Sequence, residues 1–297
     1  MDNRLALPGL RQMVRDANSL VAEATSTLSD DDAGLYGPGS VTWRLRQDAT
    51  FNVAGLRALL VQALHPVAMA AVDEHSTYRD DAWLRAERTT RYQLTTTFSS
   101  TPTAEAAAAA VRRVHAHISG VAPVTGRSYR ADDQDLLLWV HNAQVDSELA
   151  TWNTLHRPLD IDDADRFVQE QMASAALIGI DPRTVPTTST DLADYMSAAP
   201  TQMTPAAKAF GQSLLTASMP ITVRPLWFQH LAATLTVLPE PIREQYSFPR
   251  WLPTGRLSLI AQRLNVRATQ LAFGALPGVR ASRRTLRRME AAATKPT

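Results

Sequence analysis

The histidines set the chemistry open to this chain, because it has seven of them and no cysteine. The lack of cysteine excludes disulfides, iron–sulfur clusters, thiolate-bound metals and cysteine nucleophiles. A bound metal would need histidine and carboxylate ligands. The usual motifs for a serine nucleophile, a nucleotide phosphate or a helical zinc site do not occur. Single histidines are therefore the first candidates for a site.

His115 and His117 stand two residues apart in an alanine-rich segment that favours a helix. Side chains two apart on a helix point in nearly opposite directions, so the two imidazoles do not form a bidentate metal site. His115 has Val111 and Ile118 at helical spacing, and we expect it to face inward.

His141 also falls on an apolar helical face, together with Leu137 and Val145. A single inward histidine is usually a satisfied core residue, whereas inward histidines on successive helices favour a site. A neutral imidazole that faces a cavity in a helical bundle can bind a haem iron from one side. His65 and His75 are candidates to line the same cavity.

Arg85, Arg88 and Thr89 are spaced i, i+3 and i+4, so they share one face of a predicted helix. One interpretation is a solvated face that pairs with neighbouring carboxylates. The other is a polar cluster that projects into the cavity. There an arginine and a hydroxyl would hold bound oxygen, or a carboxylate such as a haem propionate.

The composition describes a globular chain of balanced charge. Its 297 residues are 45% hydrophobic and 20% charged, and the formal net charge is +1. This balance excludes a disordered chain and argues against a nucleic-acid partner. The first ten residues contain an acidic residue and no long apolar stretch, so we expect no secretory signal and a cytoplasmic location.

Helices must position these residues, because apolar residues recur at spacings of three and four along most of the chain. The segments expected to be helical are 1–30, the stripe 56–64, 81–98, 103–119, 132–145, 161–177, 204–217, 225–238 and 257–273.

Glycine, proline and capping residues predict where the helices break. Residues 34–40 (GLYGPGS) should form a turn in which Ser40 caps the next helix. Pro66 should break or kink the helix that carries the 56–64 stripe. Thr103 should cap the helix over 103–119 and Gly120 should end it. The stretch 218–223 reads as an extended link.

The expected fold class is all-α, a single-domain helical bundle of about nine helices with an internal cofactor or ligand cavity. We predict an amphipathic helix over 1–34 that packs on the domain, a helical domain over 35–275, and a basic helix and tail over 276–297. The tail arginines form either a solvated face or a contact with a membrane surface or another anionic partner. They are Arg280, Arg283, Arg284, Arg287 and Arg288.

Several short motifs, taken in order and spacing, resemble the bacterial DUF2236/MpaB-like oxygenase family. That family includes the catalytic domain of the rubber oxygenase, the latex clearing protein, and a fungal oxygenase of mycophenolic acid biosynthesis. The resemblance runs from about residue 35 to 260. The motifs are GPGS at 37–40 with WR at 43–44, LLVQALHP at 59–66, DEHS at 73–76, RAERT at 85–89, VRRVH at 111–115, YRAD at 129–132, LWVHNAQVDS at 138–147 and RPLW at 224–227.

The resemblance implies an all-α fold with non-covalent haem b. By order and spacing it assigns the axial iron ligand to His115, with His141 as a second-shell partner or the alternative ligand. It assigns polar contacts to bound dioxygen to Arg85 and Thr89. The rubber oxygenase has a lysine that reaches the iron where this chain has Arg88. A guanidinium has no lone pair to donate, so Arg88 would pair with a propionate and the sixth position would be open or hold water.

The activity so implied is a haem-dependent oxidation of a small apolar substrate by dioxygen, with an alkene or isoprenoid chain as the example. Fold and family do not by themselves fix function. Two alternatives therefore remain: a non-catalytic haem carrier or sensor, and a haem-free helical protein that binds a lipid-like ligand.

Overall fold

The computed structural model describes residues 22–29, 31–76, 78, 82–216, 224–249 and 252–274. For residues 82–87, 216, 269 and 272–274 only the backbone is described. Within these ranges the chain consists of α-helices, one short 3₁₀ turn and one small hairpin. The predicted all-α class is confirmed.

The first half of the fold leads up to a long helix, α7. Its elements are α2 (Val41–Arg46), α3 (Thr50–Gln62), α4 (Pro66–His75), α5 (Ala82–Phe98), α6 (Thr101–His115), β1 (Ser119–Val121), β2 (Ser128–Arg130) and α7 (Gln134–Leu155).

The second half wraps around that helix. Its elements are α8 (Ile161–Ile178), η2 (Pro182–Thr184), α9 (Ser189–Ala198), α10 (Pro205–Thr216), α11 (Arg224–Val237), α12 (Glu240–Tyr246) and α13 (Arg256–Gly274).

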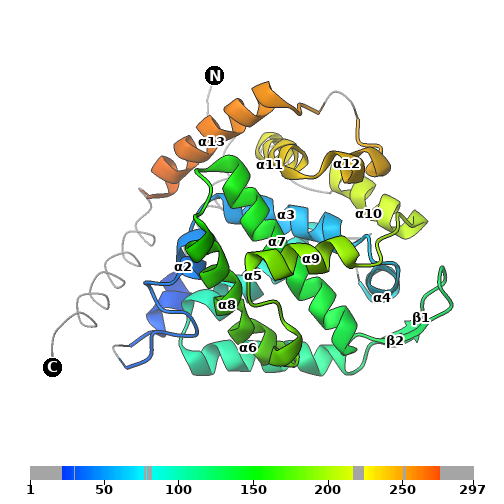
Figure 1. The fold of residues 1–297 in the computed structure, drawn as a ribbon, viewed down its shortest axis with the longest axis horizontal. Coiled ribbons are helices and arrows are strands. Elements are labelled where there is room, and N and C mark those ends of the chain that lie inside the picture. The colour runs from blue at the N-terminus through cyan, green and yellow to red at the C-terminus, as the bar shows by residue number, and fades with distance from the viewer. Residues whose placement is uncertain are drawn as a thin grey trace, which may run out of the picture.

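The core forms around α7, which runs through the middle of the molecule beside α3 (Figure 1). Leu60 of α3, Trp139 and Ala143 of α7 and Leu231 of α11 are almost fully buried in the largest apolar cluster. α13 lies along the outside, where it packs on α11 and on α7. Because α7 contacts helices on several sides, it can present polar side chains to more than one buried region.

The predicted break at Pro66 is confirmed, since α3 and α4 meet at an angle of 105°. His65 is the N-cap of α4, and its Nδ1 accepts a hydrogen bond from the Ala68 amide at 3.3 Å. No single helix in the described part of the chain is long and apolar enough to cross a membrane. The bent pair α3 and α4 meets that criterion jointly, by length and composition only. Burial of most α3 side chains in the core accounts for this apolar composition.

The predicted turn over residues 34–40 is also confirmed. Gly34 and Gly37 have φ angles of 75° and 73°, which favour glycine. A Cβ on Gly34 would lie 2.3 Å from the Ser99 carbonyl oxygen. Ser40 then caps α2 by accepting a hydrogen bond from the Trp43 amide at 3.1 Å.

Some predictions about boundaries were wrong. α6 begins at Thr101, not Thr103, with Ser100 as the N-cap residue. Gly120 does not end that helix. Instead, residue 120 pairs with Tyr129 in a two-stranded antiparallel hairpin, which projects from the helices in Figure 1.

The expected set of about nine helices was too small, because α2, α4, α9 and α12 were not among the predicted segments. The basic tail over 276–297 and the link over 218–223 lie outside the described residues, as does most of the N-terminal helix. The predicted domain boundaries stay predictions.

Candidate functional site

A buried polar layer joins four helices on one side of α7. Its centre is Arg46 at the end of α2, whose Nε and Nη2 donate to the two carboxylate oxygens of Glu148 at 2.9 and 3.1 Å. Nη1 donates to Thr97 Oγ1 at 3.0 Å, and Nη2 also donates to Gln171 Oε1 at 2.6 Å. Gln144, one turn before Glu148 on α7, donates to the same carboxylate at 2.9 Å. We call these five residues the Arg46 layer.

The charge of the Arg46 layer is held in place by its own pairing. The side chains of Arg46 and Glu148 are each 2% exposed. Burial alone would lower the pKa of Arg46, but the charges of Glu148 and Tyr36 and the hydrogen bonds to them together outweigh it, and the net shift is upward. A buried ion pair with satisfied hydrogen bonds on both partners is rigid and costly to break.

His141 lies on the same face of α7, one turn before Gln144 and two before Glu148. It is 8% exposed. Its Nε2 is buried and has no hydrogen-bond partner among the described residues. Burial, and secondarily the positive charge of Arg46, lowers the pKa of His141 to about 3. The ring is therefore neutral at physiological pH.

A buried neutral imidazole with an unpaired nitrogen has the electronic state that a metal ligand needs. An unpaired buried nitrogen is also unusual, because most buried polar atoms find a partner. The prediction that His141 faces inward is confirmed.

His115 is the last residue of α6, and its side chain is half-buried. Burial lowers its pKa, although the nearby charge of Asp132 opposes the shift. Its neighbour His117 is exposed and its ring donates to the Arg113 carbonyl at 2.7 Å. His115 is thus a neutral and accessible imidazole at a helix end. The role as iron ligand that the resemblance assigned to it stays a prediction.

Arg85, Arg88 and Thr89 all lie in α5, as predicted. The side chain of Arg85 is outside the description, while those of Arg88 and Thr89 are exposed. Their assignment to oxygen and to a propionate also stays a prediction.

The other predicted residues have local partners. His65 is buried as the cap of α4 against Trp139, with a ring-centroid distance of 5.7 Å. His75 donates from Nε2 to the Ser119 carbonyl at 3.2 Å. Asp73 accepts from Tyr78, and Glu74 accepts from the Tyr129 hydroxyl at 2.8 Å. These contacts fix α4 to its surroundings.

On another side of α7, residues from the quoted motif hold a second buried cation. Arg57 of α3 donates from Nη1 to Asp146 Oδ2 and to Ser147 Oγ, both at 2.7 Å. Its Nε donates to the Val237 carbonyl at 3.3 Å. Arg57 therefore connects α3 both to α7 and to the end of α11.

Sequence reasoning missed the Arg46 layer beside His141. Neither Arg46 nor Glu148 was singled out, because they lie 102 positions apart and only the folded chain brings them together. The available signal was the placement of His141, Gln144 and Glu148 at positions i, i+3 and i+7 within an apolar helix. Buried glutamate at such a position requires a cation.

Two pockets formed by the described residues are lined by neither His115 nor His141. One, of about 340 Å³, is lined by residues of the α7 C-terminus and α13. The other is a crevice of about 10 Å³ beside Glu148. The predicted internal cavity at the histidines is not among them.

Comparison with known proteins gives the family. The model of "ER-bound oxygenase mpaB/B′/Rubber oxygenase, catalytic domain" matches residues 43–271. Searches of curated proteins and of solved structures found no match. The family match covers most of the chain, from α2 into α13, and includes both histidines and the Arg46 layer. The chain belongs to the catalytic-domain family of the mpaB and rubber oxygenases.

Proposed function

We propose that this protein is a haem b-dependent oxygenase that uses dioxygen on a small apolar substrate, of which an alkene or an isoprenoid chain is an example. Membership of an oxygenase family supports the reaction class. The observation that carries the haem assignment is the state of His141, whose Nε2 is buried, neutral and without a partner among the described residues.

The residues present fit such a group. By the family resemblance His115 would bind the haem iron, and His141 would support that ligand or be the alternative ligand. Arg88 supplies a permanent cation for a propionate. When bound, a b haem supplies the redox chemistry that activates dioxygen.

The protein's own contribution is to fix and shield one imidazole. The Arg46 layer packs the face of α7 that carries His141, and the buried pair with Glu148 resists movement of that face. Burial, and secondarily the positive charge of Arg46, disfavours a positive charge on the ring, so His141 does not take up a proton at neutral pH. Both effects keep a neutral donor in a constant orientation.

An apolar substrate suits a chain whose interior is built from leucine, valine and alanine. We propose a cytoplasmic location. In a second form of this proposal, the basic segment 276–297 contacts a membrane surface. Such a location would give access to lipid-like substrates.

Dioxygen uptake tests the proposal. Protein loaded with haem and reduced should consume dioxygen faster with a matching apolar alkene than without one. Arg85→Ala and Thr89→Ala should slow this uptake at least tenfold while haem stays bound. Arg183→Ala is the matched control, because Arg183 is exposed and pairs with Asp181 in the η2 turn.

Two results would contradict the proposal. Bound haem with no substrate-dependent uptake across an alkene and isoprenoid panel would indicate a haem carrier or sensor. No haem binding at all would leave a helical protein for a lipid-like ligand. Unchanged turnover in both α5 variants would disprove the roles of Arg85 and Thr89.

A further inference from the structure

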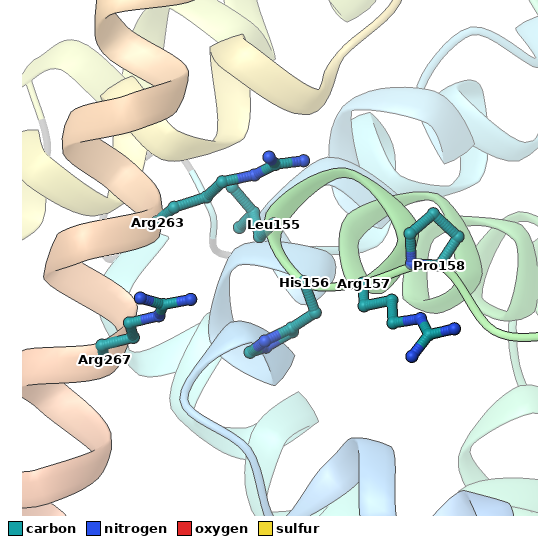
Figure 2. A pocket seen from close by; sticks show the side chains of 6 residues that line it. All are labelled: Leu155, His156, Arg157, Pro158, Arg263 and Arg267. Atoms are coloured by element: carbon teal, nitrogen blue, oxygen red, sulfur yellow. The ribbon is translucent and has the colours of Figure 1, made fainter.

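A basic pocket lies at the C-terminal end of α7, where the chain turns toward α8 and α13 passes alongside. Its volume is about 340 Å³, and its lining consists of Leu155, His156, Arg157, Pro158, Arg263 and Arg267. Figure 2 shows the side chains of Arg263 and Arg267 on α13 beside the end of α7, with His156 between Arg267 and Arg157 in this view. No described carboxylate lines this pocket.

Arg263 is anchored by the end of α7. Its Nε and Nη2 donate to the Thr154 carbonyl at 3.0 and 2.7 Å. The last carbonyls of a helix lack partners within the helix, so this contact has an ordinary capping role. Its Nη1 donates to no described residue and is left for another acceptor.

Arg157 and Arg267 have no such explanation. Both are exposed, and neither forms an ion pair with a described carboxylate. Three arginines line one small pocket, and the positive potential of such a group favours an anion there.

The buried carboxylate beside the pocket, that of Asp48, already has hydrogen-bond partners. Asp48 accepts hydrogen bonds from His156 Nε2 at 3.1 Å, from the Thr50 amide at 2.9 Å and from Gln270. Burial alone would raise the pKa of Asp48, but these hydrogen bonds outweigh it and lower the pKa. The ionised carboxylate of Asp48 holds the His156 ring in place. The Trp152 ring packs against the His156 ring, with 4.3 Å between the ring centroids.

The pocket is separate from the proposed oxygenase site. His141 and Leu155 are fourteen residues apart on α7, which corresponds to about 21 Å along the helix axis. The pocket's residues therefore do not contact a group bound at His141, and this inference does not depend on the proposed function.

We propose that this pocket binds a phosphoryl group, either of a soluble phosphate ester or diphosphate or of a phospholipid headgroup. The arginines come from two elements, α13 and the segment that follows α7. A phosphate has terminal oxygens in several directions, whereas a carboxylate presents two in one plane. The volume is at the small end for ligand pockets, which suits a phosphate or diphosphate.

Isothermal titration with inorganic pyrophosphate tests the site on the full chain. Wild type should bind, and Arg267→Gln and Arg157→Gln should each weaken binding about tenfold or more, because each removes a charge-assisted hydrogen bond. Arg256→Gln is the matched control. Arg256 begins the same helix, is exposed and does not line the pocket, so its loss should change the Kd less than about twofold.

A second arm identifies the source of the phosphoryl group. Cosedimentation uses vesicles of phosphatidylcholine with and without phosphatidic acid. Capture that requires phosphatidic acid, falls in Arg267→Gln and is displaced by pyrophosphate supports a headgroup. Pyrophosphate binding without such capture supports a soluble ligand. Failure of both probes to bind, or equal weakening by Arg256→Gln and Arg267→Gln, would overturn the proposal.

Discussion

The middle of α7 and the end of α6 each present a neutral histidine, but in opposite surroundings. His141 is 8% exposed, lies beside the Arg46 layer and has an Nε2 without a partner in the described part of the chain. His115 is half-buried at the last residue of its helix, where Asp132 partly offsets the effect of burial on its pKa. His141 is therefore a buried imidazole held beside a rigid layer, whereas His115 is an accessible one.

The difference shows which demands on a metal ligand each region meets. A ligand histidine must be neutral, held in one orientation and reachable. His141, beside the Arg46 layer, is neutral and held in one orientation. His115, at the end of α6, is neutral and reachable. The family resemblance favours His115, whereas burial favours His141, so measurements that separate the two regions carry the most information.

The largest effect should come from disrupting the Arg46 layer beside His141. Glu148→Ala leaves the buried Arg46 without its carboxylate, and should lower the free energy of unfolding by about 3–5 kcal/mol. Urea denaturation would measure this. Glu105→Ala, at an exposed position on α6, is the control and should cost less than about 1 kcal/mol. A small loss in Glu148→Ala would mean that water reaches the layer.

The hairpin that follows α6 should tolerate less change than its exposure suggests. A Cβ at residue 120 would lie 2.6 Å from the Tyr129 hydroxyl and 2.7 Å from Glu74 Oε2. Gly120→Ala should therefore destabilise the protein by about 1–3 kcal/mol and break the Tyr129–Glu74 hydrogen bond.

Thermal unfolding and the Tyr129 titration would both report this change, since burial and the Glu74 hydrogen bond raise the pKa of Tyr129 to about 12. Gly55→Ala in α3 is the control, because an added Cβ there meets no atom within 4 Å. A similar loss in both variants would contradict the packing at residue 120.

The pH dependence of stability should sharpen the contrast. The folded-state pKa of His141, about 3, is below the ordinary value of 6.5. The unfolded chain therefore takes up a proton at pH values where the folded chain does not. His141 thus lowers stability as the pH falls from about 6.5 toward 3, by up to about 1.4 kcal/mol per pH unit.

His141→Leu should remove this slope, as measured by urea denaturation at a series of pH values. His117→Leu, a change at an exposed ring, is the control and should leave the slope as in wild type. An unchanged slope in His141→Leu would show that solvent reaches the ring.

The smallest effect on the haem-free protein should come from His115→Ala. The side chain is half-buried at a helix end, so its loss should change the free energy of unfolding by less than about 1 kcal/mol. The same denaturation experiment measures it beside His141→Ala, which removes a buried side chain and should cost more. A larger cost at residue 115 would reverse the comparison.

Much of the fold was predictable because helical periodicity is local. The segments 81–98, 161–177, 225–238 and 257–273 match α5, α8, α11 and α13 closely, and the break at Pro66 follows from the chemistry of proline. The hairpin was missed because strands of three residues are too short to show alternation, and Gly120 resembles a helix stop.

The candidate site was less predictable because its contacts are long-range. The position of His141 on a buried face followed from its neighbours in the helix. The extent to which its pKa is lowered did not, since that depends on burial in the folded chain and secondarily on Arg46, which α2 brings from elsewhere in the chain. The basic pocket joins Arg157 to Arg263 and Arg267 across more than a hundred residues, and no local pattern indicates it.

The most direct test of the haem-dependent account is the absorption spectrum of protein from a haem-supplemented culture, before and after dithionite, with a pyridine haemochrome assay. We predict a Soret band with near-stoichiometric b haem, lost when the axial histidine is removed and retained in the other of the two variants, His115→Ala and His141→Ala. A flat spectrum in wild type, or full haem content in both variants, would contradict the account.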